Sequence, residues 1–132
     1  MILTIRTDKP EAEIGLFDAD GVELSYERWH AHRELEATIL QKIDDLLQEC
    51  KQRDEEYELQ GIVTYAGPGS FTGLRIGFAV TNALAWARQI PNAKATGDNW
   101  IADGIAALES VEMPQTLSPD YGSQPHITTP RK

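Results

Sequence analysis

The fold is decided by residues 61–77, which read GIVTYAGPGSFTGLRIG. The first six residues are a short apolar run bounded by glycines, which is typical of a buried strand. From Thr72 the sequence is apolar on nearly every side until Pro91, so a helix here must be covered on more than one side. A strand, a glycine-rich turn and an apolar helix in this order predict an α/β layer structure.

Three short strands are predicted before this passage, over residues 2–5, 13–18 and 22–27. The first is rich in β-branched residues, and the third alternates between apolar and polar side chains. Asp20-Gly21 is a strong hairpin signal between the second and the third. The three strands should therefore form an antiparallel meander.

An amphipathic helix is predicted over residues 32–50, because apolar side chains recur there at spacings of four and three. The repeating residues are Leu35, Ile39, Ile43, Leu46 and Cys50. The acidic residues 54–56 that follow are expected to form a solvated turn.

After the central helix we expect a short extended piece over residues 93–96 and a third helix that ends near Leu108, with Asp98 or Asn99 as its cap. The whole order predicts a mixed sheet with flanking helices, similar to the ribonuclease H-like arrangement. This domain should occupy residues 1–110. Four prolines within the last nineteen residues predict an extended tail over residues 111–132.

Length and composition restrict the class of protein. The chain has 132 residues, which suits one compact domain, and its one cysteine excludes an internal disulfide. With 21 acidic and 12 basic residues the net charge is −9, which argues against a broad nucleic-acid footprint. The sequence has neither a membrane-spanning apolar run of ~20 residues nor a basic signal-peptide region. We therefore expect a cytoplasmic protein.

The glycine-rich turn allows two interpretations. Backbone amides at a helix N-terminus bind anions, so the turn could bind phosphate. Alternatively, its glycines permit positive φ and close packing of helix on strand. The sequence is neither a Walker A loop nor a Gly-x-Gly-x-x-Gly motif. The residues concerned are Gly67, Gly69, Ser70, Thr72 and Gly73, of which Ser70 and Thr72 are candidate helix caps.

No catalytic or metal-binding set is expected from the sequence. His30 and His32 do not share a helix face, and we place them at a strand-to-helix junction. Ser70 lacks a Gly-x-Ser-x-Gly context, and Cys50 lies on an apolar stripe, which favours an inert buried thiol. The adjacent acids Asp44-Asp45 should point in different directions.

The two long helices carry more apolar surface than one sheet face requires. Leu35, Ile39, Ile43 and Leu46 can pack on the sheet, which would leave Leu40 and Leu47 facing outward. On the second helix, small and apolar residues lie close together, and such an exposed patch usually marks a protein interface. The residues predicted to form it are Leu40, Leu47, Ile76, Ala79, Val80 and Ala83. The alternative is that both helices belong wholly to the core.

Residues 67–77 resemble the signature of the TsaB (YeaZ) family, which is the non-catalytic partner subunit in bacterial synthesis of threonylcarbamoyladenosine in tRNA. The resemblance extends from Met1 to about Leu108, and residues 119–122 and 125–132 resemble the family's C-terminal end. It implies one ribonuclease H-like subdomain of the actin/Hsp70-like ATPase superfamily.

Two departures from the family pattern stand out. Family members usually have two such subdomains, and this chain resembles a shortened form that lacks most of the second. Where the family has an acid-containing turn such as Asp-Thr-Ser, this chain has Arg6-Thr7-Asp8. Because of these departures, we expect neither metal–phosphate chemistry at this turn nor independent ATP hydrolysis. We also expect the chain to use no cofactor.

The resemblance implies a scaffold subunit that binds and activates the catalytic TsaD subunit through its helices. It also implies docking of the pathway ATPase TsaE on that complex, a homodimer through the same helices, and only indirect contact with tRNA. The alternative function is a degenerate nucleotide-binding module that uses residues 67–77.

Overall fold

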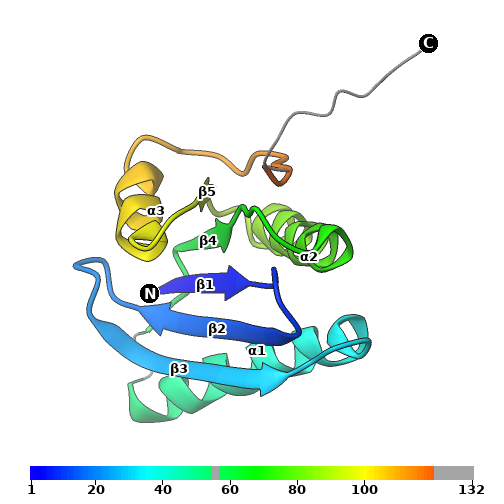
Figure 1. The fold of residues 1–132 in the computed structure, drawn as a ribbon. Coiled ribbons are helices and arrows are strands. Elements are labelled where there is room, and N and C mark those ends of the chain that lie inside the picture. Colours follow the sequence, from blue (N-terminus) through cyan, green and yellow to red (C-terminus); the bar gives the residue numbers. More distant parts are fainter. Residues whose placement is uncertain (55–56, 121–132) are drawn as a thin grey trace.

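The computed structural model describes residues 1–54 and 57–120 and contains one five-stranded sheet with three helices (Figure 1). The strands are β1 (Ile2–Arg6), β2 (Glu11–Phe17), β3 (Glu23–His30), β4 (Gly61–Tyr65) and β5 (Asn92–Ala95). The helices are α1 (Leu35–Arg53), α2 (Phe71–Arg88) and α3 (Trp100–Leu108).

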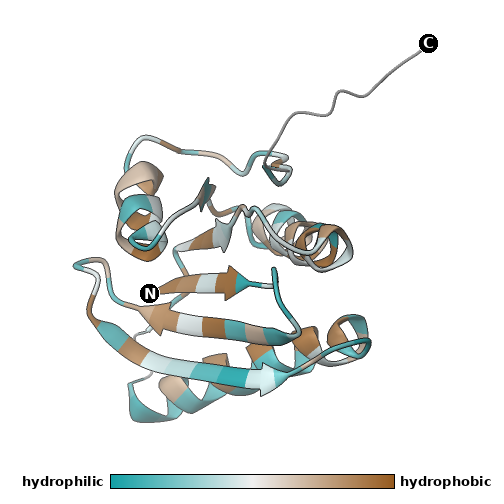
Figure 2. Cartoon of the chain, viewed as in Figure 1, coloured by the Kyte–Doolittle hydropathy of each residue, from teal (hydrophilic) through white to brown (hydrophobic). Residues whose placement is uncertain are grey.

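The sheet is mixed, as predicted, with the strand order β3-β2-β1-β4-β5. β1, β2 and β3 pair antiparallel, whereas β4 is parallel to β1 and β5 is parallel to β4. The central strands β1 and β4 are mainly hydrophobic and the edge strand β3 is mainly hydrophilic (Figure 2). This difference fits the order of the strands, because an edge strand faces water.

One face of the sheet is covered by α1 and α2. β1 and β2 direct every second residue toward these helices, and the predicted α1 stripe packs on them. Four of the stripe residues, Leu35, Ile39, Ile43 and Leu46, are 8% exposed or less, which confirms the predicted core face of this helix.

Helix α1 begins at Leu35 and not at residue 32. The amides of Ala31 and His32 both donate to the carbonyl oxygen of Pro10, at 2.9 and 3.1 Å. These hydrogen bonds to the β1–β2 loop keep residues 32–34 out of the helix, although the apolar spacing of the sequence placed them in it.

The other face of the sheet is covered over β4 and β5 by α3. Trp100, Ile105 and Leu108 pack there in one cluster with Val63 and Ala93. Asn99, one of the two predicted caps of α3, occupies the N-cap position, but its side chain makes no capping hydrogen bond.

The chain after α3 folds back over the sheet, and we call residues 111–120 the strap. In Figure 1 the strap runs from α3 past the end of β5 toward α2. The fully buried Asn92 bonds to Gln115 through its side chain and its carbonyl oxygen, with distances of 2.7–2.9 Å. Asn82 accepts from the amide of Leu117 at 3.1 Å, and the amide of Asp120 donates to Ala66 at 2.8 Å.

The rest of the predicted tail, from residue 121 on, lies outside the described residues. Within the described ranges, none of the helices is long and apolar enough to cross a bilayer.

Candidate functional site: the glycine-rich turn and the α1–α2 surface

Of the two candidate caps, Ser70 and Thr72, the structure confirms Ser70 as the N-cap of α2. Its Oγ accepts from the amide of Gly73 at 3.2 Å, and its own amide donates to the carbonyl oxygen of Asp8 at 2.9 Å. Thr72 is not the cap, because α2 begins at Phe71 and Thr72 already lies within its first turn. The glycine-rich turn is thus tied to the loop that follows β1.

The glycines of the turn are explained by close packing. A Cβ at Gly73 would overlap the carbonyl oxygen of Thr7, and one at Gly69 would overlap the side chain of Asp8. The hydroxyl of Thr7 donates to the carbonyl oxygen of Gly73 at 2.8 Å. Gly67 has φ +105°, a conformation that favours glycine. This geometry confirms the close-packing interpretation, whereas phosphate binding at the turn stays an untested prediction.

Asp8, the acid of the β1–β2 loop, forms an ion pair with Arg6. Arg6 makes two hydrogen bonds to the carboxylate of Asp8, at 2.8 and 3.2 Å, and stacks 3.9 Å above the ring of Tyr65. The Asp8 side chain is 7% exposed, so this carboxylate is already paired and largely covered.

A second polar cluster lies on the same face of the sheet, around Glu13. This residue is 8% exposed, and its carboxylate accepts from the Tyr26 hydroxyl at 2.7 Å and pairs with Lys9 and Arg28. Burial and the hydrogen bond to this carboxylate raise the pKa of the Tyr26 phenol. The cluster is a paired network without a free base.

The other candidate catalytic groups are dispersed or satisfied. Cys50 is fully buried, as predicted, and its Sγ accepts from Arg53 at 3.1 Å. Asp44 and Asp45 accept from different glutamines one turn away and so act separately. Among the residues that the structure describes, no group of three or more His, Cys, Asp or Glu could hold a metal ion.

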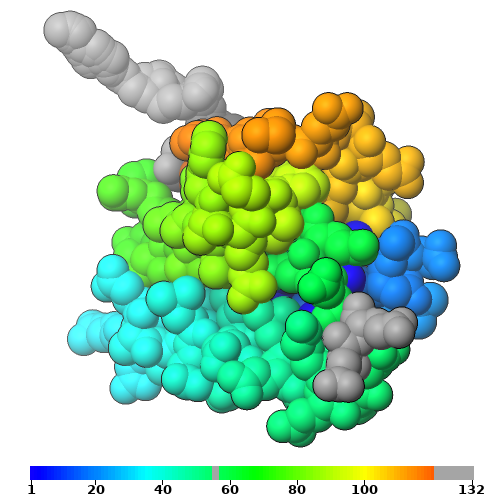
Figure 3. Space-filling model, turned by 180° about the vertical axis from the view of Figure 1, so that it is seen from behind, coloured from blue at the N-terminus to red at the C-terminus, as the bar shows by residue number. Residues whose placement is uncertain are grey.

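A hollow of about 430 Å³ separates α1 from α2, and we call it the α1–α2 groove. Figure 3, which views the molecule from behind, shows these helices side by side on one face. The groove is lined by Glu36, Ile39, Leu40, Thr72, Arg75, Ile76, Ala79 and Val80. Four of the six residues predicted for an interface therefore meet in one place, and Leu40 is 57% exposed.

The two other predicted interface residues behave differently. Leu47 does not face outward as expected, because it is 8% exposed and packs in the core cluster with Leu59 and Ile90. The segment that leads into β4 covers this part of α1, so the buried stripe of the helix is wider than its sheet contacts require. Ala83 is exposed and lies outside the groove, one turn beyond Ala79 on α2.

Sequence reasoning missed two exposed aromatic residues on α2. Trp86 is 51% exposed and Phe71 is 56% exposed. Because Ala79, Ala83 and Trp86 follow one another at spacings of four and three, they share one face of the helix. Between Arg75 and Arg88 the sequence of α2 has no charged residue, from which we expected cover on more than one side. The described residues do not provide all of this cover, because Ala79, Ala83 and Trp86 are exposed.

Comparisons with known proteins match the chain to proteins that are named for threonylcarbamoyladenosine in tRNA. The family model described as TsaD: tRNA N6-adenosine threonylcarbamoyltransferase matches residues 29–94, half of the chain. The tRNA threonylcarbamoyladenosine biosynthesis protein TsaB of Bacillus subtilis (strain 168) is 34% identical over 94 residues, covering 68% of this chain and 38% of the relative.

Two solved structures are similar to the fold. YeaZ from Pseudomonas aeruginosa matches with a TM-score of 0.62 and 26% identity over 72% of this chain and 43% of its own. A structure described as an uncharacterized protein with similarity to peptidase YEAZ from Pseudomonas aeruginosa matches with a TM-score of 0.50 and 27% identity, over 72% and 42%. The chain thus spans about two-fifths of the length of these relatives.

Proposed function

Because the chain belongs to the TsaB (YeaZ) family, we propose that it takes part in the synthesis of threonylcarbamoyladenosine in tRNA as a non-catalytic subunit. In this proposal it binds a TsaD-type subunit, which carries out the transfer. The pathway ATPase, TsaE, docks on the resulting complex. The chain's net charge of −9 favours indirect contact with tRNA.

The observation that carries the proposal is the apolar surface of α1 and α2. Leu40 and Trp86 are more than half exposed, and small residues between them let another helix approach closely. Exposed apolar area of this kind is typical of a protein interface. The partner-binding residues that we propose are Leu40, Ile76, Ala79, Val80 and Ala83. In the absence of a partner, two copies of the chain would pair through the same surface.

A non-catalytic role is supported by the state of the polar groups. The carboxylates of Asp8 and Glu13 are paired with cations, and the thiol of Cys50 is buried. In the described part of the chain we find no nucleophile beside a base.

The proposal is tested by size-exclusion chromatography with light scattering on the chain mixed with the TsaD-type subunit of its own organism. A mixed complex is expected, and Leu40→Glu should abolish it because a charge would be buried at the interface. Val22→Glu is the matched control, since Val22 is also 57% exposed but lies beside the β2–β3 turn.

A chain that stays monomeric in the mixture would contradict the proposal. The alternative, nucleotide binding at residues 67–77, predicts instead that ATP raises the Tm of the chain alone.

A further inference from the structure

Trp86, with 51% of its surface exposed, projects from the last turns of α2. It shares one face of the helix with Thr72 and Ala79, because these three residues follow one another at intervals of seven, about two turns each. Ala79 is the midpoint, about 10 Å along the axis from either end at 1.5 Å per residue. Between Ala79 and Trp86 this face carries only the small Ala83, and both alanines are exposed. The aromatic side chain therefore stands beside a stretch of α2 that another helix can approach closely.

A hollow of about 500 Å³ lies at the opposite end of α2, where α1 and α2 begin, and we call it the helix-start hollow. It continues the α1–α2 groove, with which it shares Glu36, Thr72 and Ile76. Lys9 and Arg33, both exposed, also line it, and an indole ring is a favoured partner of such cations. Its apolar lining consists of Pro10, Ala31, Leu35 and Ile76. The hollow therefore suits a tryptophan side chain.

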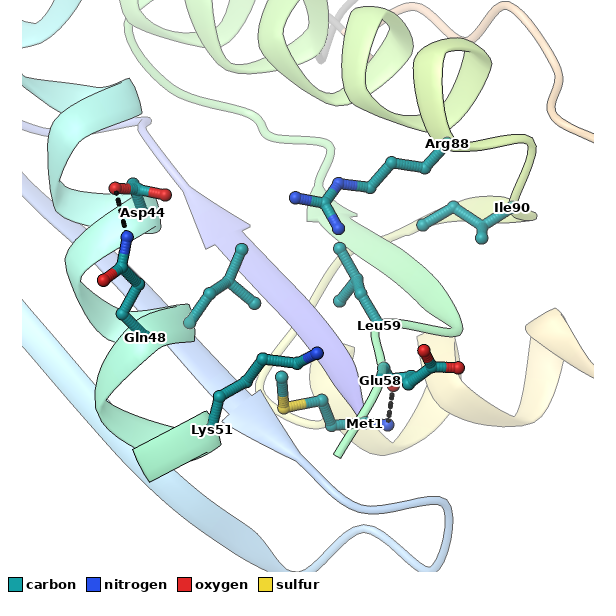
Figure 4. Close-up of a pocket in the computed structure, with 9 residues that line it drawn as sticks. Met1, Asp44, Gln48, Lys51, Glu58, Leu59, Arg88 and Ile90 are labelled. Carbon is teal, nitrogen blue, oxygen red and sulfur yellow. Dashed lines mark hydrogen bonds between the residues drawn. The ribbon is translucent and has the colours of Figure 1, made fainter. Parts of the chain in front are cut away.

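The hollow near the C-terminal end of α2 has a different chemistry. It measures about 590 Å³ and lies between the C-terminal half of α1 and the end of α2 (Figure 4). Acids and cations line it together, namely Asp44, Glu58, Lys51 and Arg88. Covering these charged groups with an indole would remove them from water, which costs free energy. A second helix parallel to α2 would bring its tryptophan to this charged end, whereas an antiparallel one would bring it to the helix-start hollow.

The spacing along α2 is self-complementary. In an isologous dimer, a twofold axis joins the same surface of both copies. An axis that passes beside Ala79 and reverses the direction of α2 places Trp86 of one copy opposite Thr72 of the other, at the helix-start hollow. It also places the long side chain of Arg75 opposite the small Ala83. Each contact then forms twice, which is a use of this surface that only a second copy of the chain can make.

We propose that a second copy of this chain docks antiparallel on the α1–α2 surface, and that each copy inserts its Trp86 into the helix-start hollow of the other. This inference rests on the proposed function, which assigns the α1–α2 surface to a partner, and adds the direction and register of the paired helices. Buried tryptophans often dominate the energetics of an interface, so Trp86 should hold the dimer together.

Cysteine cross-linking tests the register. Ala79→Cys places two thiols on either side of the twofold axis, within the Cα distance of about 7 Å that a disulfide requires. The matched control is Ala83→Cys, since two antiparallel copies of this residue lie eight residues apart, about 12 Å along the axis. Under mild oxidation we expect Ala79→Cys to form a covalent dimer several-fold faster than Ala83→Cys. The wild-type chain is the background, because its own Cys50 is fully buried.

Analytical ultracentrifugation of the chain alone tests the role of Trp86. We expect Trp86→Ala to raise the Kd of the dimer at least about tenfold. Met113→Ala, at a position 62% exposed on the strap, should leave this Kd unchanged.

The outcomes separate the inference from the proposed function. Faster cross-linking through Ala79→Cys, together with a weaker dimer in Trp86→Ala, supports the inference. Equal cross-linking through both cysteines, an unchanged Kd in Trp86→Ala, or a chain that stays monomeric at every concentration overturns it. The mixed complex with the TsaD-type subunit is measured separately, and its absence overturns the proposed function.

Discussion

The regions around α2 differ in whether other parts of the chain cover them. At the N-terminal end of the helix, the glycine-rich turn packs so closely on Thr7 and Asp8 that side chains are excluded. Beside β5, the strap satisfies the buried Asn92 with hydrogen bonds. Along the surface shared with α1, in contrast, apolar side chains such as Leu40 remain exposed.

This difference separates residues that stabilise the domain from residues that are available to a partner. In the closed regions the polar and steric requirements of the fold are met within the chain. On the α1–α2 surface the chain leaves apolar side chains uncovered, although the same two helices are well packed on their inner side. Substitutions should therefore cost folding free energy in the closed regions and binding free energy on the open surface.

The largest loss of stability is expected for Gly73→Ala. The added Cβ would overlap the backbone carbonyl of Thr7, and backbone cannot move aside as a flexible side chain can. We expect the free energy of unfolding to fall by about 3 kcal/mol, measured by urea denaturation. Thr72→Ala, an exposed position one residue earlier, should change it by less than about 0.5 kcal/mol. Equal effects at the two positions would contradict the close-packing account.

A smaller loss is expected for Asn92→Ala, which removes the side chain that holds the strap. The variant would lose the two hydrogen bonds that the buried Asn92 side chain makes to the backbone of Gln115, at a cost of about 2 kcal/mol in total. The variant should also be cut faster by proteases within residues 111–120. Asn99→Ala serves as control, because the exposed Asn99 makes no capping bond. Unchanged proteolysis of the strap in Asn92→Ala would show that Asn92 does not hold it.

Tyr26→Phe should cost about 1 kcal/mol, because Glu13 loses one of its partners. The raised pKa of the Tyr26 phenol also predicts the direction of the pH dependence. The unfolded chain releases this proton near pH 10 and the folded chain only at higher pH, so stability is retained below pH 10 and falls above it. In urea denaturation between pH 9 and 11, the decline should be weaker in Tyr26→Phe. A decline of equal slope in both proteins would exclude this residue as its cause.

The smallest effect on stability is expected for Trp86→Ala, on the open surface. Trp86 is half exposed, so the free energy of unfolding should change by less than about 0.5 kcal/mol. Affinity for the TsaD-type subunit should fall at least about tenfold, because exposed tryptophans often dominate interface energetics. Met113→Ala, at a position 62% exposed on the strap, should leave affinity unchanged. A large loss of stability in Trp86→Ala would place this residue in the core.

Much of the fold could be predicted from the sequence, since local periodicity determines it. The strand meander and the two long helices follow from apolar spacing and turn residues, and the mixed sheet follows from the order of these elements. The resemblance to the TsaB (YeaZ) family is confirmed by the relatives. The start of α1 could not be predicted, because the Pro10 carbonyl that delays it is distant in sequence.

The candidate site could be predicted only in part, because it also depends on contacts between residues that are distant in sequence. Leu40 and Leu47 both lie beside the main stripe of α1, but a distant segment covers Leu47 alone. The bonds of Asn82 and Asn92 to the strap join residues 23–35 positions apart and leave no periodic signal. Packing of this kind depends on tertiary contacts. The exposure of Trp86 depends on them too, because an uncharged helix face does not reveal whether the chain itself covers it.

The central claim is that the exposed α1–α2 surface is the one a partner covers, and hydroxyl-radical footprinting of the chain with and without the TsaD-type subunit tests it most directly. Leu40 and Trp86 are exposed apolar side chains on this surface, and Val22 and Met113 are exposed apolar side chains that lie elsewhere. The account predicts that Leu40 and Trp86 become several-fold less reactive in the complex, while Val22 and Met113 keep their rates. A complex in which Leu40 and Trp86 react as fast as in the free chain would contradict it.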